Sequence, residues 1–253
     1  MKTSSRNTLR SGWRNVAPAL LACAAALSAP AALADVIDFE QIVNHGTPAG
    51  NTVYVGGDTF STGGFLAVVA DSAYAQSFPD YEPGLAGAAI AAGEYTCTRL
   101  ACPQPLSQFY AGMNDGSLTL SREDAGAFQI SALSFGAIAP TSEDSALPFG
   151  QLRITGTRLD GSTLSAAADF PELYEWSEWT LDAAFAAATF TRITVDACTY
   201  TAARECLNGE QTSNLSQFAL DTMHVSAVPE PSTVVLLTAG LLLVAARRLG
   251  GRA

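Results

Sequence analysis

The stretch Gln151-Leu-Arg-Ile-Thr-Gly-Thr-Arg158 is followed by Asp160-Gly161 and then by Thr163-Leu-Ser-Ala-Ala167. In the first segment Leu152 and Ile154 alternate with polar residues, which is the period of a strand with one buried face. Asp160-Gly161 supplies the positive φ that a tight turn needs. The stretch therefore predicts an antiparallel hairpin, and this hairpin indicates the fold class.

Short segments of the same kind recur along the chain, separated by Gly, Pro, Asn, Asp and Ser. We expect further strands at residues 35–40, 52–55, 65–69, 117–121, 127–135, 179–181, 189–195 and 217–226. Two Ala-rich segments, 85–92 and 182–188, are expected to hold a helical turn. About ten to twelve strands without a long amphipathic helix predict an all-β fold, an antiparallel β-sandwich or jelly roll.

Residues 1–34 have the pattern of a secretory signal peptide. A basic segment precedes an apolar stretch at residues 16–29, and Ala32-Leu33-Ala34 offers a small-x-small cleavage site. The mature chain is then expected to begin at Asp35. Cleavage at Cys23, as in a lipoprotein, is the alternative, but it leaves a very short apolar core.

Residues 228–253 combine three features in order. Val228-Pro229-Glu230-Pro231-Ser232 is a stiff, extended break, residues 233–246 carry no charge, and Arg247 and Arg248 follow. As a helix the uncharged run is about 21 Å long, shorter than the about 30 Å core of a bilayer. The arginines are expected to stay cytoplasmic, which leaves the body of the protein outside.

This order of motif, short apolar span and basic end resembles the PEP-CTERM family of sorting signals. The residues that carry the resemblance are Val228, Pro229, Glu230, Pro231, Ser232, Arg247 and Arg248. It implies recognition by an integral-membrane exosortase in a Gram-negative bacterium that makes exopolysaccharide, with cleavage near the motif. The alternative is a plain C-terminal transmembrane helix that stays as an anchor.

A single extracellular domain is expected between the two signals, at residues 35–227. It holds six of the 13 Lys and Arg residues and 23 of the 24 Asp and Glu residues, so its formal charge is −17, against −11 for the whole chain. Such a surface repels nucleic-acid phosphates, and no nucleic acid is expected as a partner. The charge also favours solubility, which is the commoner reason for an acidic surface.

Four cysteines remain after signal cleavage: Cys97, Cys102, Cys198 and Cys206. An even count in an oxidising compartment favours disulfides, and four cysteines allow three pairings. The two close spacings favour Cys97–Cys102 and Cys198–Cys206. A four-thiolate metal site is the alternative, although these spacings are not typical of zinc sites.

The best candidate for ligand binding is the segment Pro171-Glu-Leu-Tyr-Glu-Trp-Ser-Glu-Trp179. Tyr174 and Trp176 offer flat apolar faces with polar tips, which suit sugar rings at a wet surface, and the glutamates between them can accept hydroxyl hydrogen bonds. The alternative is that the two side chains only cover a loop. For Trp179 we expect a place in the core.

A structural calcium ion is the one cofactor considered. In lectin-like jelly rolls the first and last strands often lie side by side, so Asp38 or Glu40 is expected to approach Asp221, and calcium prefers such oxygen ligands. The chain lacks a nucleophile elbow and a histidine metal motif, which argues against an enzyme. The expected function is that of a structural cell-surface or extracellular-matrix protein associated with exopolysaccharide. A lectin-like module and, third, a polysaccharide-acting enzyme are the alternatives.

Intact-mass measurement of the protein from cells and from medium tests both signals. We expect a mature chain that begins at Asp35 and lacks part of the tail, because the tail is a processing signal. A mass that corresponds to Asp35–Ala253 would show instead that the tail is a lasting anchor.

Overall fold

In the computed structural model the predicted hairpin consists of β12 (Gly150–Thr157) and β13 (Thr163–Asp169). The strands pair antiparallel from Gln151 opposite Asp169 to Thr157 opposite Thr163. Gly161 takes a φ of +83°, and its N–H donates to the carbonyl of Arg158 at 3.0 Å. The hairpin prediction is therefore confirmed, with a positive φ at the glycine that the turn requires.

The structure describes residues 34–48, 50–91, 97, 100–103, 107–140, 150–207, 216–228 and 240. Leu33–Val228 forms one compact unit, separate from residues 1–32 and 229–253. The predicted signal peptide and the sorting tail therefore lie almost wholly outside the described residues. Within the described residues no helix is long and apolar enough to cross a membrane, and the expected span at 233–246 is outside them except for Gly240.

Two antiparallel sheets make up most of the body, which confirms the all-β prediction. Sheet A is seven-stranded, and its order is β14 (Ser177–Thr180), β10 (Phe128–Ala137), β17 (Phe218–Ala227), β8 (Phe109–Gly112), β6 (Leu85–Ile90) and β3 (Val53–Val55), with β1 (Ala34–Ile37) paired to β17.

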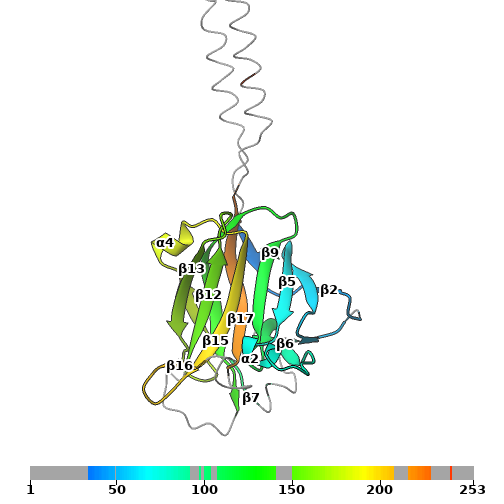
Figure 1. Ribbon diagram of the computed structural model, residues 1–253. Coiled ribbons are helices and arrows are strands. Elements are labelled where there is room, and N and C mark those ends of the chain that lie inside the picture. The colour runs from blue at the N-terminus through cyan, green and yellow to red at the C-terminus, as the bar shows by residue number, and fades with distance from the viewer. Residues whose placement is uncertain are drawn as a thin grey trace, which may run out of the picture. The chain divides into compact units, whose positions relative to one another are not determined.

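Sheet B is eight-stranded and includes the hairpin. Figure 1 shows the hairpin strands β13 and β12 next to the other strands of this sheet. Its order is β13, β12, β15 (Arg192–Tyr200), β9 (Ser117–Arg122), β5 (Phe65–Ala70), β4 (Thr59–Thr62) and β2 (Val43–His45), with β16 (Cys206–Leu207) paired to β15. A small third sheet pairs β7 (Leu100–Ala101) with β11 (Ala139–Pro140).

Aromatic side chains join the inner faces of sheets A and B into one core. Tyr54 of sheet A stacks on Phe60 of sheet B, with ring centroids 4.8 Å apart. Phe65 of sheet B meets Phe128 of sheet A edge to face at 5.0 Å. All four side chains are buried, so these contacts stabilise the sandwich through buried apolar area and ring geometry.

A second apolar cluster covers the outer face of sheet A. It includes Ala88 and Ile90 of β6, Phe109 of β8 and Ala219 of β17, and Trp176 packs against it. Residues of β6 thus contribute to both clusters, because both faces of this strand are covered. One face of sheet A is therefore in the core and the other is partly covered by neighbouring segments.

One local prediction was wrong. The Ala-rich segment 85–92 was expected to hold a helical turn, but Leu85–Ile90 forms β6 between β3 and β8. Alanine favours helix only weakly against tertiary packing, and here the small residues are needed between layers. A Cβ on Gly87 would lie 2.3 Å from the hydroxyl oxygen of Tyr110, so only glycine fits beneath that ring.

The second Ala-rich segment does contain a helical turn, α4 (Ala183–Ala186). Asp182 is its N-cap, and the Oδ1 atom of Asp182 accepts the N–H of Phe185 at 2.8 Å. A similar turn, α2 (Ala73–Gln76), follows β5 and is capped by Ser72. Asp and Ser immediately before short apolar runs are the local signals of both turns.

Gly156 in β12 provides a test of core packing. A Cβ at this position would lie 2.2 Å from the ring of the buried Phe190, so Gly156→Ala should lower the free energy of unfolding by about 1–3 kcal/mol through overpacking. The measurement is denaturant unfolding.

The matched control is Gly84→Ala, where the nearest atom to a new Cβ is 3.7 Å away, and it should change stability by less than about 0.5 kcal/mol. Equal effects of the two substitutions would show that a general backbone effect of replacing glycine by alanine, and not the Phe190 contact, sets the cost at Gly156.

Candidate functional site

The aromatic segment predicted from the sequence connects the edge strand β13 of sheet B with the edge strand β14 of sheet A. The N–H of Glu175 donates to the carbonyl of Glu172 at 3.2 Å and closes a turn. Tyr174, the third residue of that turn, has a φ of 70°. Glycine or asparagine usually occupies a turn position with positive φ, so a tyrosine here holds a strained backbone.

The two aromatic residues of the segment differ in exposure. Tyr174 exposes 47% of its surface, whereas Trp176 is half-buried and meets the ring of Phe109 edge to face at 5.5 Å. The two glutamates of the turn, Glu172 and Glu175, are exposed. Tyr174 is thus the accessible ring, and Trp176 anchors the segment on the outer face of sheet A.

The first and last strands lie side by side, as the sequence predicted for the acidic residues. β1 pairs with β17, with Ile37 opposite Met223, so Asp38 follows β1 near Asp221 of β17. Burial raises the pKa of Asp221; Glu40 and Asp38 raise it further through charge repulsion, and the N–H of Thr222 opposes these effects. The three carboxylates that the sequence singled out are therefore electrostatically coupled.

Gln108 holds this acidic junction to β8. Its backbone N–H donates to Oε1 of Glu40 at 2.9 Å, and its side-chain Nε2 donates to the carbonyl of Phe39 at 2.6 Å. The ring of the next residue, Phe109, is in contact with the ring of Trp176. In the β8–β17 pair Tyr110 lies opposite Leu220, so Phe109 and Asp221 are neighbours on the outer face of sheet A. Two segments far apart in sequence thus meet on one surface.

The calcium prediction has no further support from the geometry. Among the residues that the structure describes, no group of three or more His, Cys, Asp or Glu side chains is placed to hold a metal ion. Burial, and then repulsion from Glu40 and Asp38, raises the pKa of Asp221, and calcium at this junction stays a prediction.

The two cysteine pairs differ. Cys198 of β15 and Cys206 of β16 form a disulfide, with Cα atoms 5.6 Å apart, and it closes a short loop beside the hairpin. Cys97 and Cys102 are not bridged; instead the buried Cys102 thiol is hydrogen-bonded to Cys97, and burial followed by this contact raises its pKa. The Cys97–Cys102 disulfide therefore stays a prediction.

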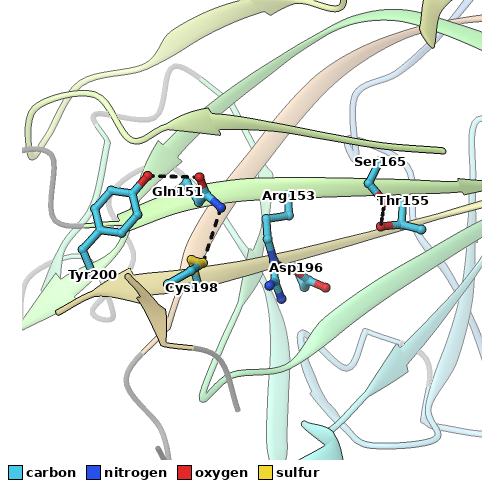
Figure 2. A network of polar contacts seen from close by, with 8 residues as sticks. Gln151, Arg153, Thr155, Ser165, Asp196, Cys198 and Tyr200 are labelled. Atoms are coloured by element: carbon cyan, nitrogen blue, oxygen red, sulfur yellow. Dashed lines mark hydrogen bonds and ion pairs between the residues drawn. A yellow bond between two sulfur atoms is a disulfide. The ribbon is translucent and has the colours of Figure 1, made fainter. Parts of the chain in front are cut away.

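The outer face of sheet B carries a polar network that the sequence did not single out (Figure 2). Nε of Arg153 on β12 donates to Oδ1 of Asp196 on β15 at 2.6 Å, and Thr155 and Ser165 are hydrogen-bonded at 3.0 Å. Burial raises the pKa of Asp196, although Arg153 favours its charged form. These side chains occupy alternate positions whose neighbours are in the core, so the strand period places them on one face.

A cleft of about 350 Å³ lies at one end of this face. Its lining comes from the end of β5, from α2, from the turn before β9, and from β9, β12 and β15: Ala70, Asp71, Ser72, Ala73, Gln76, Asp115, Ser117, Arg153, Asp196 and Ala197. No linear pattern joins these residues, because strand order and not sequence spacing brings them together. Only the cap signal at Ser72 was readable beforehand.

The described part of the sorting segment ends at Val228, whose N–H donates to the carbonyl of Ala127 at 3.0 Å. The remaining motif residues and both arginines lie outside the described residues. Residues 227–249 match the PEP-CTERM protein-sorting motif. The chain is therefore a PEP-CTERM protein, and the recognition made from the sequence is confirmed. This motif indicates an exported protein that is processed by an exosortase at the membrane.

A search among curated proteins gave no match. Among solved structures, TmCBM61 in complex with β-1,4-galactotriose is 11% identical, with 57% of this chain and 83% of that chain covered and a TM-score of 0.31. The CBM22-1 xylan-binding domain from Paenibacillus barcinonensis Xyn10C is 12% identical, with 77% and 94% covered and a TM-score of 0.32. At such scores the likeness is loose and assigns no ligand to this chain.

The raised pKa of Asp221 predicts a dependence of stability on pH. Since the folded-state pKa exceeds the unfolded value of about 3.9, the native state binds more protons, and stability falls as pH rises from that value through the folded-state pKa. Asp221→Asn keeps the side-chain oxygen that accepts the Thr222 N–H at 2.7 Å. It should therefore raise Tm at neutral pH and lose this advantage in acid, measured with a chelator present.

Asp124→Asn is the control, because the pKa of Asp124 is shifted in the opposite direction to that of Asp221. Arg122 and the N–H of Gly126 lower the pKa of Asp124, so its neutralisation should lower Tm at neutral pH or leave it unchanged. A neutral-pH loss of stability in Asp221→Asn, measured with the chelator, would show that another donor stabilises the charge of Asp221, contrary to the prediction.

Proposed function

We propose that this is a non-enzymatic cell-surface or extracellular-matrix protein that associates with exopolysaccharide. The observation that carries the proposal is the junction between body and tail: β17 ends at Ala227, the residue at which the sorting motif begins. The last strand of the sandwich thus leads directly into the signal. In the sequence, the sorting motif therefore follows the folded acidic domain directly.

The mature surface suits a hydrated polysaccharide matrix. The body carries a formal charge of −17, which keeps it soluble and apart from polyanions. The Cys198–Cys206 disulfide and a continuous aromatic core between two sheets stabilise it in an oxidising compartment. In this proposal the exosortase acts on Val228–Ser232, and the protein is held at the inner membrane only during sorting.

A lectin-like role is the second candidate, and Tyr174 is the observation that favours it. A non-glycine residue with φ near +60° costs about 1–3 kcal/mol and persists where surrounding structure imposes it, often at functional sites. Here the strained residue is also an exposed aromatic ring. Trp176 fixes the segment on Phe109, so the Tyr174 ring is displayed from a rigid support for stacking on a sugar face.

Co-sedimentation of the exported protein with exopolysaccharide from its own bacterium tests both candidates. Wild-type protein should pellet with the polymer. Tyr174→Gly should pellet less, although it should keep or raise the free energy of unfolding, by up to about 1 kcal/mol, because glycine relieves the positive φ.

Ala125→Gly is the matched control, since Ala125 is exposed with a φ of 58°. It should show the same backbone effect on stability and no change in sedimentation. If wild-type protein does not pellet, the proposed association is wrong; if Tyr174→Gly pellets like wild type, the aromatic site is wrong.

A further inference from the structure

The cleft on sheet B lies on a different surface from Tyr174 and Trp176, which are at the outer face and edge of sheet A. Its lining residues include Asp71, Asp115, Asp196 and Arg153, and the Asp71 carboxylate accepts the hydroxyl of Tyr81 and the N–H of Gly84. The lining is therefore net negative in a body that is already strongly acidic. A ligand that carries carboxylate, sulfate or phosphate would be repelled here, so the charge restricts the ligand to neutral or cationic chemistry.

Asp115 joins the lining of the cleft to the segment that precedes β17. It exposes only 8% of its surface, and its Oδ1 accepts the N–H of Ser216 at 2.8 Å. Its Oδ2 has no hydrogen-bond partner in the structure. Oδ2 itself has almost no accessible surface, so the bond to Ser216 holds Asp115 in place, and this oxygen is not a contact for a ligand in the cleft.

The other polar groups offer both donors and acceptors. Ser72 Oγ accepts the N–H of Ala75 at 3.1 Å, which leaves its hydroxyl hydrogen to donate. Gln76 uses Nε2 for the carbonyl of Asp71 at 2.7 Å, which leaves its Oε1 to accept. Arg153 binds Asp196 through Nε, one of its several N–H donors. A cation would be repelled by the charge of Arg153. Sugar hydroxyls fit a lining with both donors and acceptors, because each hydroxyl can donate and accept a hydrogen bond.

The size and the apolar part of the lining fit a small ring. A volume of about 350 Å³ is near the lower end of the usual range for ligand sites, about 300–1,000 Å³. Ala70 and Ala73 provide methyl groups against which the C–H face of a sugar can pack.

We propose that this cleft binds one or two neutral sugar units of a polysaccharide, with Gln76 and Asp196 as acceptors and Ser72, Ser117 and Arg153 as donors. The inference rests on the proposed association with exopolysaccharide and adds a second contact surface, on sheet B. Binding at both surfaces would let one molecule hold two polysaccharide strands, which suits a matrix protein.

Nuclear magnetic resonance titration of the isotopically labelled exported protein tests the site, with cellobiose as neutral probe and with glucosamine and glucuronate as charged probes. Cellobiose should shift the amide signals of residues 70–76, 115–117, 196 and 197. Ala73→Phe places a ring into the cleft from an exposed position on α2 and should weaken cellobiose binding at least about tenfold. Thr155→Ala, on the same face but outside the cleft, should bind like wild type.

Ser117→Ala provides a second variant should Ala73→Phe misfold, and loss of its hydroxyl should weaken binding several-fold. The proposal is overturned if cellobiose leaves the cleft signals unmoved, if only a charged probe moves them, or if neither variant weakens binding. Sedimentation with exopolysaccharide but no cellobiose shifts would refute the cleft alone. Cellobiose shifts at the cleft without sedimentation would refute the proposed association alone.

Discussion

The rest of the structure depends on the shared aromatic core between sheets A and B. Tyr54 with Phe60, and Phe65 with Phe128, join strands that are distant in sequence. Side chains alternate between the two faces of a strand, so the neighbours of each residue in this core point to an outer face. The core thus decides which polar residues reach solvent, and it holds them on a rigid support.

The outer faces of the two sheets have different characters as a result. On sheet A an apolar cluster holds Trp176, and beside it Asp221 meets the acidic residues that follow β1. On sheet B ion pairs and hydroxyl pairs run across the strands and end at a cleft. Under the proposed association with exopolysaccharide, the exposed residues of both outer faces are available for contact with polymer, since neither face is needed to bury the core between the sheets.

Local features of the sequence predicted most of the strands but not every element. The hairpin at 151–167 was readable because alternation and turn chemistry act over a few neighbouring residues. The strand Leu85–Ile90 was not, because alanine and glycine occur there to leave room for Tyr110 and the layers around it, and that need arises only after packing. The short strands β2, β4 and β8 were missed for a different reason: three or four residues are too few to show a clear alternation.

By itself the sequence determined that the protein is all-β, acidic and exported under a PEP-CTERM sorting signal, and it identified Tyr174, Trp176, Asp38, Glu40 and Asp221 as residues of interest. Only the tertiary structure decided that Trp176 and Asp221 share one face, that Tyr174 holds a positive φ, and that Asp115 and Arg153 line a common cleft. The physical reason is that signals and strand periods are encoded in consecutive residues, whereas neighbours across a sheet are set by strand order and register.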